Sequence, residues 1–142
     1  DRLLSQVEEA ISGLEDPAEI VTVGFDRLWG EVRSDPQLQA VYFGLAAEAA
    51  TDPSLRETLT YINDGYRDLI HKLVSDGRGR GLDVRWDEGS LTVLIIAGIQ
   101  GLTLQFLERG ETEELRRAIA DFKRWLVWTT SFGDDRPQSA QS

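Results

Sequence analysis

The sequence has no cysteine, no methionine and only one histidine, His71. The absence of cysteine excludes disulfides, thiol nucleophiles and metal sites built on cysteine. A single histidine excludes most metal centres and catalytic triads that depend on imidazole. Because position 1 is an aspartate rather than a methionine, we expect the chain to begin downstream of its translation start.

Basic residues are also scarce. The chain has 15 lysines and arginines against 25 aspartates and glutamates, and its formal net charge is −10 at pH 7. A protein of this charge repels nucleic acids and anionic membranes over most of its surface. No signal peptide or lipidation signal is visible, so we expect a cytoplasmic protein without a membrane partner. The length of 142 residues fits one domain with one core.

Prolines are few, and three of the four follow an aspartate, at Pro17, Pro36 and Pro53. Each Asp-Pro pair supplies an N-cap carboxylate and a proline at the first helical position. Apolar residues recur at helical spacing along the chain, and no strand pattern is visible. We therefore predict an all-α bundle of about six helices over residues 1–133, followed by a polar, disordered tail at 134–142.

The segment 87–109 has apolar residues on two faces of one predicted helix. Thr92, Gly98 and Gln100 interrupt it, so we do not predict a membrane span. One stripe must face the core of its own chain, and we expect another copy of the chain to cover the second. The first stripe is Leu91, Leu94, Ile95, Gly98, Leu102, Gln105 and Phe106, and the second is Val93, Ile96, Ala97, Gln100, Leu104 and Leu107.

A last helix at about 112–132 also has a second stripe, made of aromatic residues. Left in water, this stripe and the second stripe of 87–109 would form a larger apolar patch than soluble monomers usually expose. We therefore predict a homodimer joined through these two helices. The predicted interface residues are Val93, Ala97, Gly101, Leu104, Trp125, Trp128 and Phe132.

No group of residues points to catalysis. Asp68 and His71 lie three apart on a predicted helix, but two ligands do not make a metal site. Gly77, Gly79 and Gly81 follow a helix instead of a strand and lack the lysine and hydroxyl residue of a phosphate loop. We predict a protein that is not an enzyme, with no catalytic residues, no metal and no cofactor.

Aromatic residues fall on the inward stripes of successive helices. An ordinary core explains any one of them, whereas several of them with a few polar groups describe the wall of a small-molecule pocket. Such a pocket would take an apolar or amphipathic ligand. The predicted ligand-binding residues are Phe25, Trp29, Tyr42, Ile62, Tyr66, Leu69 and Ile99, and the polar candidates are Tyr66, His71, Gln100 and Thr103.

Two stretches together resemble the C-terminal domain of TetR-type transcriptional regulators. Residues 74–88 form a glycine-containing link and an acidic turn, and residues 94–105 form an apolar helix with a small residue followed by Gln100-Gly101-Leu102 at its centre. Aspartate is common in that family where this chain has Gln100. The short acidic Asp-Pro turns before the predicted helices are also typical of the family, so the resemblance covers about residues 1–132.

The resemblance implies an all-helical ligand-binding domain whose last two helices form a four-helix bundle with those of the partner copy. It also implies an N-terminal helix-turn-helix that binds operator DNA, which would precede this chain, and a linker helix at residues 1–14. Ligand binding would release the DNA by moving that helix. A stand-alone all-helical interaction module, or an enzyme subunit without a regulatory role, remains the alternative interpretation.

We predict that this chain alone does not bind duplex DNA specifically. Its net charge is −10, and the small basic cluster of Arg78, Arg80 and Arg85 lies in a link rather than on a recognition helix. An electrophoretic mobility assay with the 142-residue chain tests this prediction, and sequence-specific retardation of a DNA fragment would contradict it.

Overall fold

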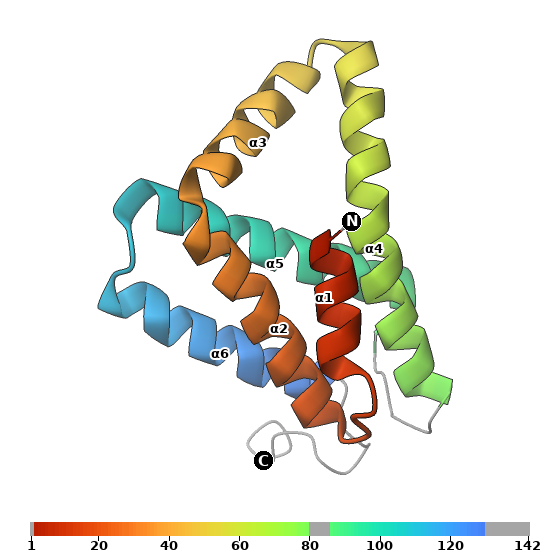
Figure 1. Cartoon of the computed structure of the whole chain (residues 1–142). Coiled ribbons are helices and arrows are strands. Elements are labelled where there is room, and N and C mark those ends of the chain that lie inside the picture. Colours follow the sequence, from red (N-terminus) through yellow and green to blue (C-terminus); the bar gives the residue numbers. More distant parts are fainter. Residues whose placement is uncertain (1, 80–85, 130–142) are drawn as a thin grey trace.

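The computed structural model describes residues 2–79 and 86–129, and this part of the chain is helical apart from short turns (Figure 1). The prediction of an all-α fold with about six helices is confirmed. The expected tail at 134–142, the interface residue Phe132, and Arg80 and Arg85 of the basic cluster lie outside the described residues. The helices are α1 (Arg2–Ile11), α2 (Pro17–Ser34), α3 (Pro36–Ala49), α4 (Pro53–Gly79), α5 (Glu88–Arg109) and α6 (Glu113–Thr129).

Three helices begin at the predicted Asp-Pro pairs. The carboxylates of Asp16, Asp35 and Asp52 each accept a hydrogen bond from a backbone N–H two or three residues further along. At Asp52, hydrogen bonds from the Leu55 N–H and the Ser54 hydroxyl hold the pKa of the carboxyl below its usual value. The first N–H groups of a helix have no partner within the helix, so these caps fix where the helices begin.

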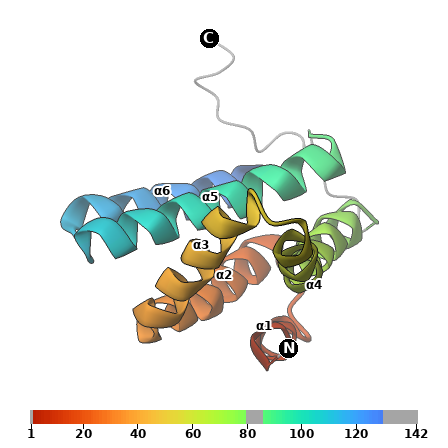
Figure 2. The same ribbon diagram turned by 90° about the horizontal axis from the view of Figure 1, so that it is seen from above.

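The helices form two layers. α5 and α6 lie side by side in one layer, and the other four helices lie on one side of that pair (Figure 2). α2 packs on α6, α1 packs on α2, and α4 packs on α5. α3 and α4 are joined by a short turn and diverge from it, so that in Figure 1 they form an inverted V above α5.

The core lies between α2, α5 and α6. Phe25 stacks on Trp29 with ring centroids 6.2 Å apart and meets Phe122 of α6 at 5.8 Å. Trp29 meets Phe106 of α5 edge to face at 5.9 Å, so the rings join all three helices. The buried residues of this cluster are Phe25, Trp29, Val32, Val74, Leu91, Ile95, Leu115 and Leu126.

An ion pair also joins α2 to α6. The Lys123 Nζ lies 2.7 Å from an Asp26 carboxylate oxygen, and the Asp26 side chain is 57% exposed. Ion pairs at such exposed positions contribute about 0–1 kcal/mol, whereas full burial of one large apolar side chain contributes about 1.5–3 kcal/mol. The buried rings, rather than the ion pair, therefore hold α2 against α6.

Gly98 sets the close approach of α5 to α6. A Cβ atom built on Gly98 would lie 2.5 Å from Cε1 of Phe122, well inside van der Waals contact. The Phe122 ring has little freedom to yield, because Phe25 packs on it at 5.8 Å and Trp125 at 5.7 Å. Only a residue without a side chain fits at position 98 with the ring in this place.

α5 is long and apolar enough to cross a membrane by length and composition, and 17% of its most apolar window is buried within this chain. In this structure it contacts α3, α4 and α6 as one helix of the domain. Gly110 ends the helix with a positive φ of 77°, and its N–H donates to the Phe106 carbonyl.

We expect Gly98→Ala to destabilise the fold by about 1–2 kcal/mol. Overpacking a core costs about 1–3 kcal/mol, which exceeds the roughly 0.5–1 kcal/mol that alanine gains over glycine within a helix. Gly30→Ala in α2 is the control, because a Cβ there meets nothing within 4 Å, and it should stabilise the fold. Urea denaturation followed by circular dichroism measures both variants. Equal stabilisation by both would contradict the packing argument.

Candidate ligand-binding cavity

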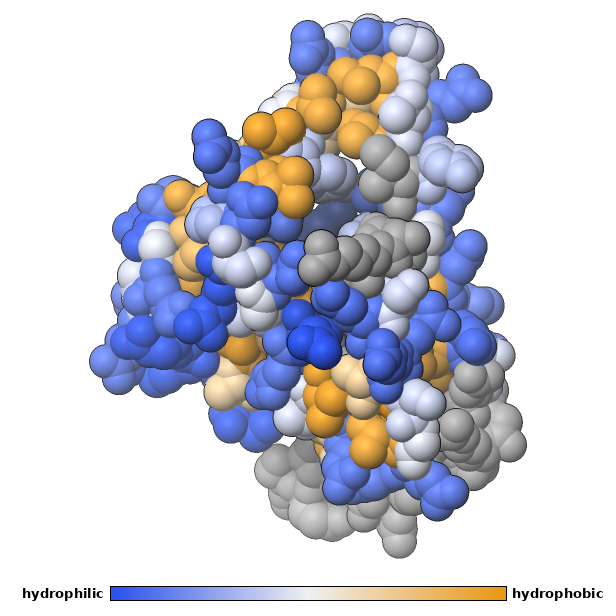
Figure 3. Space-filling view, viewed as in Figure 1, coloured by the Kyte–Doolittle hydropathy of each residue, from blue (hydrophilic) through white to orange (hydrophobic). Residues whose placement is uncertain are grey.

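A half-open cavity of about 980 Å³ lies among the helices, and residues from all six of them line it. Part of it opens between α3 and α4, where the surface is hollowed and apolar side chains gather along α3 (Figure 3). Leu38 and Val41 of α3 are 58% and 55% exposed at this edge. A concave, mostly apolar space of several hundred Å³ is typical of small-molecule sites.

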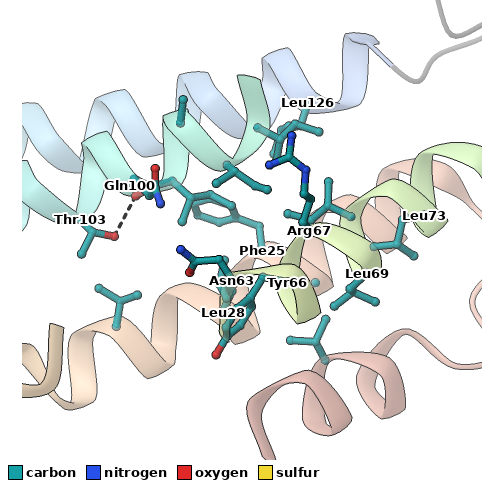
Figure 4. A pocket seen from close by; sticks show the side chains of 18 of the residues that line it. Phe25, Leu28, Asn63, Tyr66, Arg67, Leu69, Leu73, Gln100, Thr103 and Leu126 are labelled. Carbon is teal, nitrogen blue, oxygen red and sulfur yellow. Dashed lines mark hydrogen bonds between the residues drawn. The ribbon is translucent and has the colours of Figure 1, made fainter. Parts of the chain in front are cut away.

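Each helix brings its apolar stripe to the wall. α1 contributes Val7 and Ile11, which lie four apart on one face of that helix. α4 contributes Tyr66, Leu69 and Leu73, which alternate in steps of three and four and so point the same way. Figure 4 shows that Leu69 and Leu73 come from α4 and that Phe25 and Leu28 come from α2. The wall is therefore built from the same helical periodicity that builds the core.

A pair of polar side chains joins α3 to α4 across the cavity. The Tyr42 hydroxyl donates a hydrogen bond of 2.9 Å to the Asn63 side-chain oxygen. Burial raises the pKa of the nearby Tyr66 hydroxyl, and the negative charge of Glu31 and the proximity of Tyr42 add to that shift. A tyrosine of ordinary pKa is already protonated at neutral pH, so with this shift Tyr66 remains a neutral phenol at the cavity wall.

On the other side, α5 supplies Gln100 and Thr103, which lie three apart and line the cavity. The Thr103 hydroxyl donates to the Ile99 carbonyl at 2.8 Å, the dashed line in Figure 4. In Figure 4 the Arg67 side chain extends from α4 toward α5 and α6. The cavity is thus apolar over most of its wall, with a few polar groups and the charged residues Glu8, Arg67 and Lys72 among its lining.

Five of the seven predicted ligand-binding residues line this cavity: Phe25, Tyr42, Tyr66, Leu69 and Ile99. Trp29 is not among the described lining residues, because its indole is buried between Phe25 and Phe106 in the core. Ile62 lies in α4, and its side chain is outside the described part of the structure.

Among the polar candidates, Tyr66, Gln100 and Thr103 line the cavity, whereas His71 is exposed and is not one of the described lining residues. Sequence reasoning missed Asn63 and Arg67. They lie four apart on α4, beside the apolar stripe that contains Tyr66 rather than within it, so apolar periodicity gave no signal for either residue.

The predicted interface residues divide into two groups. Val93 and Ala97 lie at the edge of the cavity wall, and both are exposed, as are Gly101 and Leu104. Part of the second stripe of 87–109 therefore faces the cavity of its own chain.

Trp125 and Trp128 are partly covered within the chain. The ring of Trp86 packs on Trp125 at 6.4 Å and on Trp128 at 6.3 Å. Whether a second copy covers the rest of these surfaces stays a prediction.

The chemistry that this arrangement allows is binding. Among residues 2–79 and 86–129 no group of three or more His, Asp or Glu side chains is placed to hold a metal ion. A cavity with apolar walls and separated polar groups can enclose a small molecule and fix its orientation by hydrogen bonds.

Comparison with known protein families gives one match. The model of the family described as the C-terminal part of BetI-type transcriptional repressors matches residues 25–128, which span most of α2 through nearly all of α6. No curated protein and no solved structure matches the chain significantly. The matched range includes the core and most of the cavity wall, and the family is regulatory rather than enzymatic. The chain therefore belongs to the TetR-type regulators, as a C-terminal domain of the BetI-type repressor family.

Proposed function

We propose that this chain is the effector-binding and dimerisation domain of a TetR-like transcriptional repressor. The observation that carries the proposal is the half-open cavity of about 980 Å³, to which every described helix contributes. Its effector is an apolar or amphipathic small molecule. Phe25, Tyr42, Tyr66, Leu69 and Ile99 line the space in which it would bind.

α1 provides the means of coupling. A ligand in the cavity would touch Val7 and Ile11 of α1 as well as the walls from α4 and α5. A ligand shifts a conformational equilibrium only by its differential affinity for the two states, and contact with α1 supplies such a difference. Movement of α1 would change the distance between two DNA-reading heads, which must match half-sites about one helical turn apart.

Operator DNA would be bound by an N-terminal helix-turn-helix of the whole protein, in the cytoplasm. The family's description as a repressor C-terminal part supports this assignment. The coding sequence immediately before residue 1 separates this proposal from a stand-alone helical interaction module. A helix-turn-helix there supports a regulator, and an unrelated sequence there contradicts it.

Dimerisation would use the outward face of α5. Leu94, Ala97, Gly101 and Leu104 follow one another in steps of three, four and three, so they share one face of the helix. Leu94 and Leu104 are 44% and 46% exposed. The small residues between the two leucines allow the backbones of two helices to approach closely, which supports a symmetric pairing through α5 and α6.

We expect apolar and amphipathic compounds to raise the melting temperature of the chain. At about 100 times its Kd, a ligand that binds only the folded state adds about 2.7 kcal/mol, which is about 5–10 °C for a chain of this size. A thermal-shift screen that includes 1-dodecanol measures the effect. Leu69→Trp should weaken the shift, because it adds a ring to the cavity wall.

The matched control for this variant is Asp68→Trp, which places the same ring at an exposed neighbouring position outside the described cavity wall. It should leave the thermal shift unchanged. A screen without stabilisers, or equal shifts in the unmodified chain and Leu69→Trp, would contradict the assignment of this cavity.

We also expect the chain to sediment as a homodimer at micromolar concentration and Leu104→Glu to sediment as a monomer. An unpaired buried charge costs about 3–5 kcal/mol, which weakens association by about 100-fold or more. Leu38→Glu is the control, because it changes a leucine that is 58% exposed on α3. Sedimentation equilibrium decides the matter, and a monomeric mass for the unmodified chain ends the proposal of a dimer.

A further inference from the structure

The charge of the cavity wall differs from that of the whole chain. The chain carries a formal net charge of −10, yet the charged residues among the described lining are Arg67, Lys72 and Glu8. Two cations and one carboxylate give this wall a net positive charge. All three residues are exposed, so solvent screens their charges in part. A charge at the wall still acts on a ligand in the cavity more than a distant surface charge does, because the Coulomb energy falls with distance.

Arg67 is the cation best placed to act on a ligand. It lines the cavity, and in Figure 4 its side chain extends from α4 toward α5 and α6, although the residue remains exposed. Within the described part of the chain, its guanidinium has neither an ion pair nor a hydrogen bond, although Arg33, Arg116, Arg117 and Lys123 each have an acidic partner. Its five N–H donors are thus available to a group that enters the cavity.

Neutral donors accompany Arg67. Asn63, one turn away on the same face of α4, uses its side-chain oxygen to accept from Tyr42, which leaves its NH₂ group for other partners. Tyr66 brings a neutral phenol to the wall, and Gln100 supplies a further amide from α5. The polar part of the wall is therefore rich in hydrogen-bond donors around one cation.

We propose that the effector is an amphipathic monoanion, with a carboxylate head held by Arg67 and an apolar chain that lies along the rest of the wall. This inference rests on the proposed function, since it names the class of ligand for the same cavity. A guanidinium donates two parallel hydrogen bonds to a carboxylate. A neutral alcohol has only one oxygen and cannot accept this pair, and a quaternary ammonium has no acceptor. Phe25, Leu28, Leu69 and Leu73 provide apolar surface for the chain of the ligand.

Two acidic residues act against an anion, and their positions limit that effect. Glu8 lines the cavity from α1, and Lys72 on the same wall offsets its charge. Glu31 acts electrostatically on Tyr66 but is not among the described lining residues. Phe25, Tyr42 and Tyr66 could also surround a quaternary ammonium, so a cationic probe is the necessary comparison.

The test compares three probes with the same twelve-carbon chain: dodecanoate, 1-dodecanol and dodecyltrimethylammonium. Isothermal titration calorimetry with the full chain near pH 7, below the concentration at which the probes form micelles, should rank dodecanoate first. Arg67→Gln should weaken dodecanoate binding by about 10-fold to 100-fold and leave 1-dodecanol binding nearly unchanged. Arg67→Lys keeps the charge but lacks the planar guanidinium, so it should weaken dodecanoate binding less than Arg67→Gln does.

Arg27→Gln is the matched control. It removes the same charge from an exposed position on α2 outside the described cavity wall, and it should not change the ranking of the probes. Equal binding of dodecanoate and 1-dodecanol, tighter binding of the cation, or no effect of Arg67→Gln would overturn this inference and leave the cavity as a binding site. Failure of all three probes to bind would overturn the proposed function together with the inference.

Discussion

α5 has apolar side chains around most of its circumference, and the rest of the structure depends on how each sector is covered. Leu91 and Ile95 face the core, where Gly98 lets the Phe122 ring of α6 pack directly on the α5 backbone. A second sector, which includes Ile96, lines the cavity. The third is outward and partly exposed, with Leu104 at its end. One helix thus connects the core, the cavity and the candidate interface. A displacement of α5 at one of them strains the packing at the other two.

The domain has a tightly packed half and an open half. Aromatic rings from α2, α5 and α6 pack around Phe25 and Trp29, and cores of this kind resist deformation. α3 and α4 diverge from their joining turn, and a hydrogen bond from Tyr42 to Asn63 connects them near the cavity. α3 has one buried residue, Ala49, whereas α5 has four, so α3 is the easier helix to rearrange. A cavity between a rigid half and an adaptable half suits a protein whose ligand must move a neighbouring helix.

The sequence alone determined the helices and much of their burial. The Asp-Pro pairs predicted three helix starts, and a carboxylate caps each of them, because that geometry is local to a few residues. Apolar periodicity predicted the inward placement of Phe25, Tyr66 and Leu69, since spacing along a helix fixes the angle at which a side chain leaves it. The motifs in the link and in α5 were sufficient to identify the TetR-type family, which the family match confirms.

Only the tertiary structure decided which neighbour each inward side chain meets. Periodicity could not separate Trp29, which is enclosed by rings of the core, from Phe25, which touches both core and cavity. Nor could it show that Trp86 packs on the two tryptophans of α6. The position of Arg67 at the cavity wall was equally hidden, because it lies beside the apolar stripe of α4 and remains exposed, as an arginine on a helix usually does. Helical spacing tells on which side of its own helix a side chain lies. A site forms where side chains from several helices meet, and only the packing of the helices determines that.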